Sequence, residues 1–360
     1  MDLPVDVLSR ARRAADAFNA LTGVTTDAAE LLTGRATLLG LSPQGRISAG
    51  GATRLMRSGD GWCALTLSRQ DDVDAIPALL ESDSVDDPWP AVEQWTADNA
   101  SADITMRARL LGLPVAALGE TPAAPTRITS LGAATEPRPI DELLVADLSA
   151  MWAGPLCGQL LARAGATVVK VESPNRPDGT RAGPASFFNW MNSGKLSYAA
   201  DFDDPCELRK LLDAADVVIE SSRPAALANR GLGPTSRDGQ IWLRITGHGT
   251  DGDHANWVAF GDDAAVSGGL VRGGKDDPEF CGDAIADPLT GLHAALAVAE
   301  SLSRGGGELI ELSMAAVAAT YAIEAGANET RCSAIPEPSP PARELGADNA
   351  LVERLVGAKC

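Results

Sequence analysis

One stretch decides the fold of this chain: residues 143–181, LLVADLSAMWAGPLCGQLLARAGATVVKVESPNRPDGTR. It opens with an apolar run of strand length, Leu143–Leu148, and a tight turn at residues 153–155 follows. Apolar residues then recur at i, i+4, i+5 and i+8 over residues 156–164, on one face of a helix. The next run, Thr167–Val171, is β-branched and mostly apolar, as in strands that are buried on both faces. A strand, a helix and a strand in this order predict a βαβ unit, and therefore a parallel sheet covered by helices.

The rest of the second half of the chain repeats this alternation. The runs at residues 216–220, 241–245 and 308–312 predict further strands, the first of them buried. Helices are expected at residues 205–215, from Pro288 onward, and at residues 313–324.

Composition limits the classes of partner. The formal net charge of −19 argues against nucleic acid or an anionic membrane surface. With three histidines and six scattered cysteines that form no C-x-x-C pair, we expect no metal site. The N-terminal residues MDLPVDVLSR are charged and unlike a signal peptide, and no run of about 18 apolar residues occurs. We therefore expect a cytoplasmic protein that binds neither nucleic acid nor membrane.

The N-terminal third predicts a separate α+β domain. Helical spacing recurs at residues 5–20 and again between residues 91 and 111. Two strand-like runs flank the turn Ser58–Gly61, a pattern typical of a β-hairpin. The predicted division is a small α+β domain at 1–125, a Pro-, Ala- and Thr-rich linker at 126–140, a large domain at 141–330, and a Pro-rich segment with a terminal helix at 331–360.

The run DLSAMWAGPLCGQLLARAGATVVKVESP, with DGTR after it, resembles the opening of family III CoA-transferases. That family includes formyl-CoA and carnitine CoA-transferases and the α-methylacyl-CoA racemases. Later matches are Lys195 and Ser197, the segment RPAAL at 223–227 and the turn TGHG at 246–249. The resemblance implies an α/β fold with an open, mostly parallel Rossmann-like sheet flanked by helices and a smaller α+β domain, assembled as a homodimer.

The order of the two parts differs from that of the family. The segment SGDGWCALTLSRQDDVDAIPALLES, at residues 58–82, is similar to the small domain that normally follows the large one. We therefore expect a circularly permuted arrangement, which chains tolerate where the joined ends lie close together at the surface.

Asp287 is the candidate catalytic residue. Local chemistry gives it a structural alternative, because an Asp before Pro288 is a strong N-cap for the helix that follows. The resemblance implies instead that Asp287, in the family's D-x-x-[ST]-G motif, attacks an acyl-CoA thioester. Covalent catalysis by a carboxylate then proceeds through an anhydride and an aspartyl-CoA thioester. Coenzyme A and acyl-CoA are substrates, with a carboxylic acid as acceptor, and no permanently bound cofactor is expected.

Several residues are expected to surround CoA. By resemblance, the loop between the first strand and helix lines the site, and cations contact the phosphates. The predicted CoA-binding residues are Ala150, Met151, Trp152, Lys195, Arg223, Arg230 and Arg181. Gly268 and Gly269 are candidate sources of oxyanion donors. The ordinary alternatives are solvated surface arginines and turn glycines. Ser173 and Asn229 stand where the family commonly has arginine, which puts CoA affinity in doubt.

Two other functions stay open. Racemisation of an α-methylacyl-CoA needs a His and an Asp as an acid–base pair, and Val258–Phe260 lacks the His expected there. His293, in the helix after Asp287, has core packing as its ordinary role. A CoA-binding homologue without catalysis is the second alternative, motivated by Ser173 and Asn229.

Overall fold

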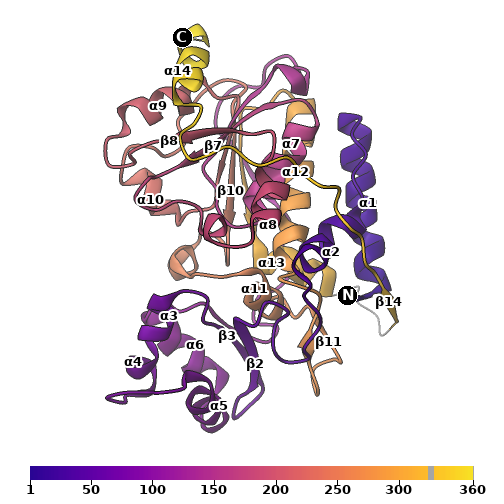
Figure 1. The fold of residues 1–360 in the computed structure, drawn as a ribbon, viewed down its shortest axis with the longest axis vertical. Coiled ribbons are helices and arrows are strands. Elements are labelled where there is room, and N and C mark those ends of the chain that lie inside the picture. Colours follow the sequence, from indigo (N-terminus) through magenta and orange to yellow (C-terminus); the bar gives the residue numbers. More distant parts are fainter. Residues whose placement is uncertain (323–327, 360) are drawn as a thin grey trace.

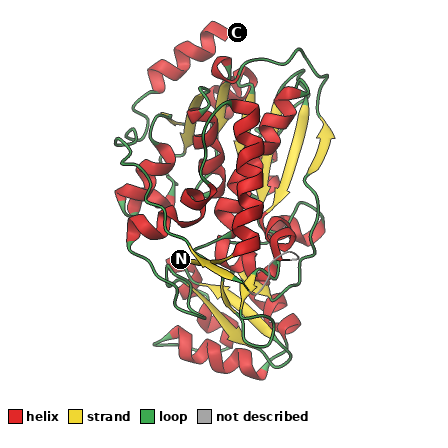
Figure 2. Cartoon of the chain, turned by 90° about the vertical axis from the view of Figure 1, so that its right-hand side faces the viewer, coloured by secondary structure: helices red, strands yellow, loops and turns green. Residues whose placement is uncertain are grey.

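The computed structural model describes residues 1–322 and 328–359. A large unit contains a central sheet with helices on its faces, and a smaller unit lies at one end of it (Figure 1). Figure 2, turned by 90°, shows long helices lying against the sheet and a second small group of strands in the lower unit. Among the described residues, no helix combines the length and the apolar character needed to cross a membrane.

The central sheet has seven strands in the order β5-β13-β10-β9-β6-β7-β8. Six are parallel, and β5 joins the edge antiparallel to β13. From β6 the parallel strands run outward in both directions, which is the order of a Rossmann-type sheet and confirms the predicted fold class. The strands are β5 (Arg127–Ser130), β6 (Leu144–Asp147), β7 (Thr167–Glu172), β8 (Leu196–Ala199), β9 (Val217–Glu220), β10 (Ile241–Thr246) and β13 (Glu308–Ser313).

Helices bury both faces of this sheet. One face packs against α7, α12 and the N-terminal helices in the largest apolar cluster, and the other packs against α9 and α14. The helices are α1 (Val5–Thr22), α2 (Ala28–Leu39), α7 (Ala153–Arg163), α8 (Ala185–Asn192), α9 (Pro205–Ala214), α10 (Pro224–Ala228), α11 (Gly261–Ser267), α12 (Ala286–Ser303), α13 (Met314–Ala322) and α14 (Asn349–Lys359). The predicted helix at 313–324 is seen to Ala322, and its last two residues lie outside the described residues.

The small unit has its own core. Its three-stranded sheet β2-β3-β4 is antiparallel, and apolar side chains of β3 and the helices around it form a separate cluster. The turn at Ser58–Gly61 joins the two strands of the predicted hairpin. The elements are β2 (Thr53–Arg57), β3 (Trp62–Thr66), α3 (Gln70–Asp74), α4 (Ile76–Leu80), α5 (Pro88–Asp98), α6 (Ser101–Leu110) and β4 (Val115–Ala117).

Packing divides the N-terminal third differently from the predicted boundaries. Helices α1 and α2 bury their apolar faces against α12 and α8 in the large unit, away from the small sheet. The predicted linker contains β5, a strand of the central sheet. Its side chains are exposed, so its sequence carries no sign of burial. The first strand β1 (Asp2–Pro4) pairs with β14 (Glu329–Arg331), and β11 (Val271–Arg272) pairs with β12 (Glu279–Phe280).

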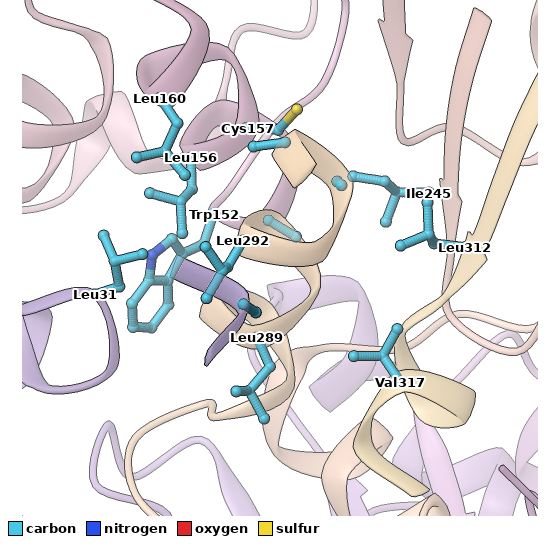
Figure 3. Packing of buried hydrophobic residues seen from close by; sticks show 14 of the residues in the cluster. Leu31, Trp152, Leu156, Cys157, Leu160, Ile245, Leu289, Leu292, Leu312 and Val317 are labelled. Carbon is cyan, nitrogen blue, oxygen red and sulfur yellow. The ribbon is translucent and has the colours of Figure 1, made fainter. Parts of the chain in front are cut away.

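The close crossing of α7 and α12 positions the site. Gly291 of α12 lies against the carbonyl of Ala153 and the side chain of Leu156, and a Cβ there would come within 2.9 Å of both. Glycine at this crossing lets the two backbones approach. Figure 3 shows the apolar cluster around this crossing, with Leu31 on one side of the Trp152 indole and Leu292 on the other. The N-terminal ends of both helices are thereby brought together.

Candidate active site

Asp287 is the second residue of α12 and faces the N-terminus of α7. Because α7 follows β6, the carboxyl group lies at the carboxyl edge of the sheet, near the point between β6 and β9 where the strand order reverses. Open α/β sheets bind their ligands at this edge. The side chain is partly buried. Ile285 occupies the N-cap position of α12, so Asp287 does not act as the N-cap of its own helix.

The backbone N–H groups of Ala153 and Gly261 act on the Asp287 carboxylate and lower its pKa. Each belongs to the first residue of a helix, α7 and α11, where N–H groups have no partner within the helix. At Gly261 a side chain is excluded, because a Cβ would collide with the Asp287 carboxylate and the carbonyl of Ala284. The carboxylate is therefore oriented by the ends of two neighbouring helices.

The turn before α12 is held in an unusual conformation. Ala284 has a φ of +43°, which non-glycine residues rarely adopt. Its N–H donates to Oδ1 of Asp262 at 2.9 Å, and its carbonyl accepts the N–H of Asp287 at 2.9 Å. Asp262 thus stabilises the turn that aims Asp287. Backbone strain of this kind occurs at functional sites.

Four aspartates and one arginine gather around this point. Arg35 of α2 pairs with Asp283, with 2.5 Å between Nη1 and Oδ1. Burial raises the pKa of Asp287 to about 7, and the charge of Arg35 and the two backbone donors offset the rise only in part. Burial likewise raises the pKa values of Asp262 and Asp263 to about 7, and it also raises the pKa of Asp283. At neutral pH Asp262, Asp263 and Asp287 are therefore each partly protonated.

The small unit contacts this group directly. Oδ1 of Asp263 accepts a hydrogen bond from the Thr66 hydroxyl of β3 at 2.8 Å, and Thr66 in turn contacts Thr53 at 2.9 Å. The hydroxyls of Thr121 and Ser267 lie 2.8 Å apart at the other end of α11. Helix α11 is thus the element through which the small unit reaches the site.

The predicted CoA loop has both exposed and buried members. Ala150 is exposed, and Met151 is 40% exposed with a φ of +72°. The N–H of Met151 donates to both oxygens of Asp178 at 3.2 Å. Trp152, by contrast, is only 3% exposed and packs edge-to-face on Phe187, with 5.3 Å between ring centroids. Its position in the apolar core leaves Ala150 and Met151 as the accessible residues of this loop.

Lys195 is buried with three oxygen partners. Its Nζ lies 2.8 Å from Oδ2 of Asp147, 2.8 Å from the carbonyl of Pro155 and 3.1 Å from Oδ1 of Asn192. These contacts tie β8 to β6 and to the first turn of α7. The structure thus gives Lys195 a bracing role beneath the site, and its predicted contact with CoA stays a prediction.

The predicted arginines differ in their partners. Arg181 forms an ion pair with Glu172 at 2.6 Å, and Arg230 pairs with Asp203 at 3.0 Å. Arg223 is exposed just after β9, and its side chain has no hydrogen bond or ion pair with any described residue. It is therefore the most available of the three for a phosphate group. A cavity of about 420 Å³ lies elsewhere, between the end of α2 and Arg331.

The predicted oxyanion donors have other partners. The N–H of Gly268 donates to the carbonyl of Ala264 at 3.0 Å, and that of Gly269 donates to Val266 at 2.9 Å. Gly268 also lies where α11 meets α13, since a Cβ there would approach the carbonyl of Ala315. The backbone donors that do lie at Asp287 are those of Ala153 and Gly261.

Sequence reasoning missed four charged members of the site. Asp262 and Asp263 form an acidic pair just before a predicted glycine turn, and Asp283 lies within the motif that identified Asp287. Their acidity was visible, but their burial was not. Arg35 carried no signal, because it lies in a helix that is far away in the sequence. No group of three or more His, Cys, Asp or Glu side chains within residues 1–322 and 328–359 has a metal-binding arrangement.

This chain belongs to CoA-transferase family III, whose model matches residues 140–349, more than half of the sequence. Asp287 and its backbone donors lie within that region, whereas Arg35 and Thr66 lie outside it.

Relatives with known names match part of the chain. It is similar to the succinyl-CoA–D-citramalate CoA-transferase of Chloroflexus aurantiacus, 31% identical over 197 residues that cover 49% of each chain. It is also similar to the succinate–glutarate CoA-transferase of Agrobacterium fabrum, 36% identical over 189 residues, or 46% of this chain and 47% of the relative. The chain thus spans about half the length of the curated relatives it matches. A Mycobacterium tuberculosis structure titled as a hypothetical protein (Rv3272) aligns with a TM-score of 0.47 at 30% identity, covering 51% of this chain and 56% of that one.

Proposed function

We propose that this protein transfers coenzyme A between an acyl-CoA and a carboxylic acid, with Asp287 as the nucleophile. The observation that carries the proposal is the partly buried Asp287 carboxylate, oriented by the N–H groups of Ala153 and Gly261 within the region that matches the family. The two relatives are named as CoA-transferases that act on dicarboxylic acids, and these names support the same chemistry.

The first half-reaction attaches CoA to Asp287. One carboxylate oxygen attacks the thioester carbonyl, the C–S bond breaks, and CoA leaves as a thiolate. The product is a mixed anhydride between Asp287 and the acyl group. The thiolate then attacks Cγ of Asp287, the anhydride C–O bond breaks, and the donor acid leaves as a carboxylate. Asp287 now carries CoA as a thioester.

The second half-reaction runs the same steps in reverse order. The acceptor carboxylate attacks Cγ of Asp287 and expels the thiolate, which forms a new anhydride. The thiolate attacks the acyl carbonyl of the acceptor, which releases the new acyl-CoA and restores the Asp287 carboxylate. Protons and electrons balance without a redox partner.

The backbone donors suit the attacks at Cγ. In each such attack, negative charge develops on a carboxyl oxygen of Asp287 itself. The N–H groups of Ala153 and Gly261 already favour the charged form of this carboxylate, so they are placed to stabilise that oxyanion. We therefore assign to them the role that the sequence suggested for Gly268 and Gly269.

The test is peptide mass spectrometry after incubation with a panel of acyl-CoAs. We expect a CoA or acyl adduct on the peptide that holds Asp287, trapped by hydroxylamine and absent from Asp287→Asn. The matched control is Asp262→Asn, which removes the other partly exposed carboxylate of the site. An adduct found on Asp262 instead of Asp287 would overturn the assignment. CoA binding without any adduct would favour a racemase or a CoA-binding homologue, and exchange of the substrate α-proton with deuterated solvent would identify the racemase.

We propose in addition that the chain is a homodimer with the permuted order of units suggested by its sequence. The position of the family match, which follows the small unit, supports the permuted order. Light scattering after size-exclusion chromatography tests the dimer, for which a mass near 37 kDa would be a contrary result.

A further inference from the structure

We propose that Arg35 is a positioning residue for Asp287: its guanidinium, held by Asp283 and two aromatic rings, favours the carboxylate form of the nucleophile. The catalytic consequence rests on the proposed function. The contacts themselves come from α2, which lies outside the region that matches the family. A residue outside that region would thus adjust the charge of a nucleophile within it.

Arg35 is fixed on three sides. Its Nη1 lies 2.5 Å from Oδ1 of Asp283, which is 1% exposed. Its guanidinium carbon lies 5.4 Å from the ring centroid of Trp152 and 5.5 Å from that of Phe187. Trp152 directly precedes Ala153, whose backbone N–H lowers the pKa of Asp287. One side chain therefore contacts both the residue beside an Asp287 donor and the turn that leads into α12.

The positive charge of Arg35 offsets the negative charge of the carboxyl groups around Asp287. Helix α11 contributes Asp262 and Asp263, and the turn before α12 contributes Asp283. The cation among the charges that act on Asp287 is Arg35, and α7 contributes a backbone donor. Further along α12, His293 faces Tyr321 from α13 at 2.8 Å, and Arg10 of α1 lies over that tyrosine ring.

Burial places the pKa of the proposed nucleophile, Asp287, close to neutral pH. Burial raises the pKa of Asp287 to about 7, Arg35 opposes this rise most strongly, and Asp283 adds to it. Asp283 also has an oxygen, Oδ2, that is buried without a hydrogen-bond partner in the described part of the chain. Arg35 therefore has two carboxylates within its influence, and only Asp283 forms the direct ion pair.

Opposite substitutions should shift the nucleophile in opposite directions. Arg35→Gln removes the cation, so the pKa of Asp287 should rise by about one unit or more. Asp283→Asn removes a like charge and releases Arg35, so the same pKa should fall. Arg35→Lys keeps the charge and should restore most of the wild-type behaviour. Arg46→Gln, which breaks an exposed ion pair with Asp277, is the matched control and should leave the titration unchanged.

Two measurements separate this inference from the proposed function. The first follows the γ-carboxyl carbons of 13C-labelled aspartate by NMR during a pH titration, with the Asp287 signal identified by its absence in Asp287→Asn. The second is the pH dependence of adduct formation on Asp287. We expect about a tenfold loss of rate for Arg35→Gln near pH 6, with recovery at higher pH.

The possible results differ for the two ideas. Opposite shifts of the Asp287 signal without any adduct would support the electrostatic role and overturn the transferase function. Adduct formation with unchanged titration in both variants would overturn the role of Arg35, and so would shifts in the same direction. If Arg35→Gln does not fold, Asp283→Asn decides the question, because a raised or unmoved pKa contradicts the inference.

Discussion

The role of Asp287 depends both on its neighbours in the sequence and on residues far away in the sequence. By local pattern, the Asp287–Pro288 pair is a helix start, and Asp287 would be its N-cap. In the structure α12 begins two residues earlier than this pattern predicts, at Ala286, and the backbone N–H groups at the starts of α7 and α11 act on the Asp287 carboxylate. The Asp287 carboxylate thus does lie at helix N-termini, but they are those of α7 and α11 and not that of its own helix.

The fit of Asp287 against α11 gives the first prediction. Gly261→Ala adds a methyl group that collides with the carboxylate and with the Ala284 carbonyl. Displacement of the nucleophile by about 1 Å should lower the rate of adduct formation roughly 100-fold. Stopped incubations with acyl-CoA and mass spectrometry measure this. Gly357→Ala is the control, because a Cβ there meets no atom within 4 Å. Equal rates for the two variants would show that the close approach is not needed.

At the scale of elements, the loop before α7 depends on a buried ion pair. Nζ of Lys170 lies 2.7 Å from Oδ2 of Asp178 and 2.6 Å from the carbonyl of Ser149. Asp178 in turn accepts the N–H of Met151, which keeps that residue at a φ of +72°. The pair thus determines the shape of the predicted CoA loop.

Breaking this pair gives the second prediction. Lys170→Met leaves Asp178 buried without its cation, which should cost about 3–5 kcal/mol of unfolding free energy. The double variant with Asp178→Asn should regain part of that loss, because no buried charge is left unpaired. Urea unfolding of the four proteins of this double-mutant cycle measures the coupling. A purely additive cycle would contradict the proposed pairing.

The edge of the sheet gives the third prediction. Asn349 at the start of α14 accepts the N–H of Ala199 in β8 at 2.9 Å and donates to its carbonyl at 3.0 Å. Asn349→Ala leaves these backbone groups unpaired by protein and should cost about 1–3 kcal/mol. Hydrogen exchange at Ala199 should accelerate. Glu353→Ala, on the exposed face of α14, should leave that exchange unchanged, and equal protection in both variants would contradict the edge-sealing role.

The elements found from sequence are those whose pattern reflects burial. Strands β6, β7, β9 and β10 are mostly apolar, β13 carries two glutamates among its apolar residues, and all five were predicted close to their observed bounds. Of the residues that match the family, Lys195 directly precedes β8 and Ser197 lies within it. Strand β5 escaped prediction because its residues are exposed, so only its partner β13 defines it.

The candidate site was only partly predictable for a similar reason. The motif around Asp287 is continuous in sequence and could be recognised. Three of the charged residues around it, Arg35, Asp262 and Asp263, come from other elements, and no periodicity indicates that the helix carrying Arg35 packs beside α12. Likewise, Trp152 was assigned to the CoA site by its position in a loop, whereas the structure buries it at 3% exposure.

At the scale of the whole molecule, the small unit is joined to Asp287, the proposed nucleophile, through α11. Thr66 of β3 donates to Asp263, and the pKa of Asp263 is raised to about 7 by burial, with Asp287 adding to the rise. The unit outside the family match therefore helps to bury the acidic group. Docking of the two units and protonation of the site are linked in this arrangement.

This linkage makes stability depend on pH, which is the last prediction. The folded-state pKa of Asp263 is raised above its unfolded value of 3.8, so the folded protein binds more protons between about pH 4 and pH 7. Its contribution to stability is complete below the unfolded pKa and is lost as pH rises toward 7. Asp262 and Asp287 act in the same direction. The free energy of unfolding should therefore fall from pH 5 to pH 8 by an amount on the order of a few kcal/mol.

Asp263→Asn tests the assignment. The amide of asparagine cannot ionise, but its oxygen can still accept the hydrogen bond from the Thr66 hydroxyl. Urea unfolding at several pH values should show a smaller loss of stability between pH 5 and pH 8 than in the wild type. Asp83→Asn, at an exposed position in the small unit, should keep the wild-type slope. If Asp263→Asn keeps that slope as well, Asp263 is already ionised in the folded protein, and the contact with Thr66 does not link docking of the small unit to protonation of the site.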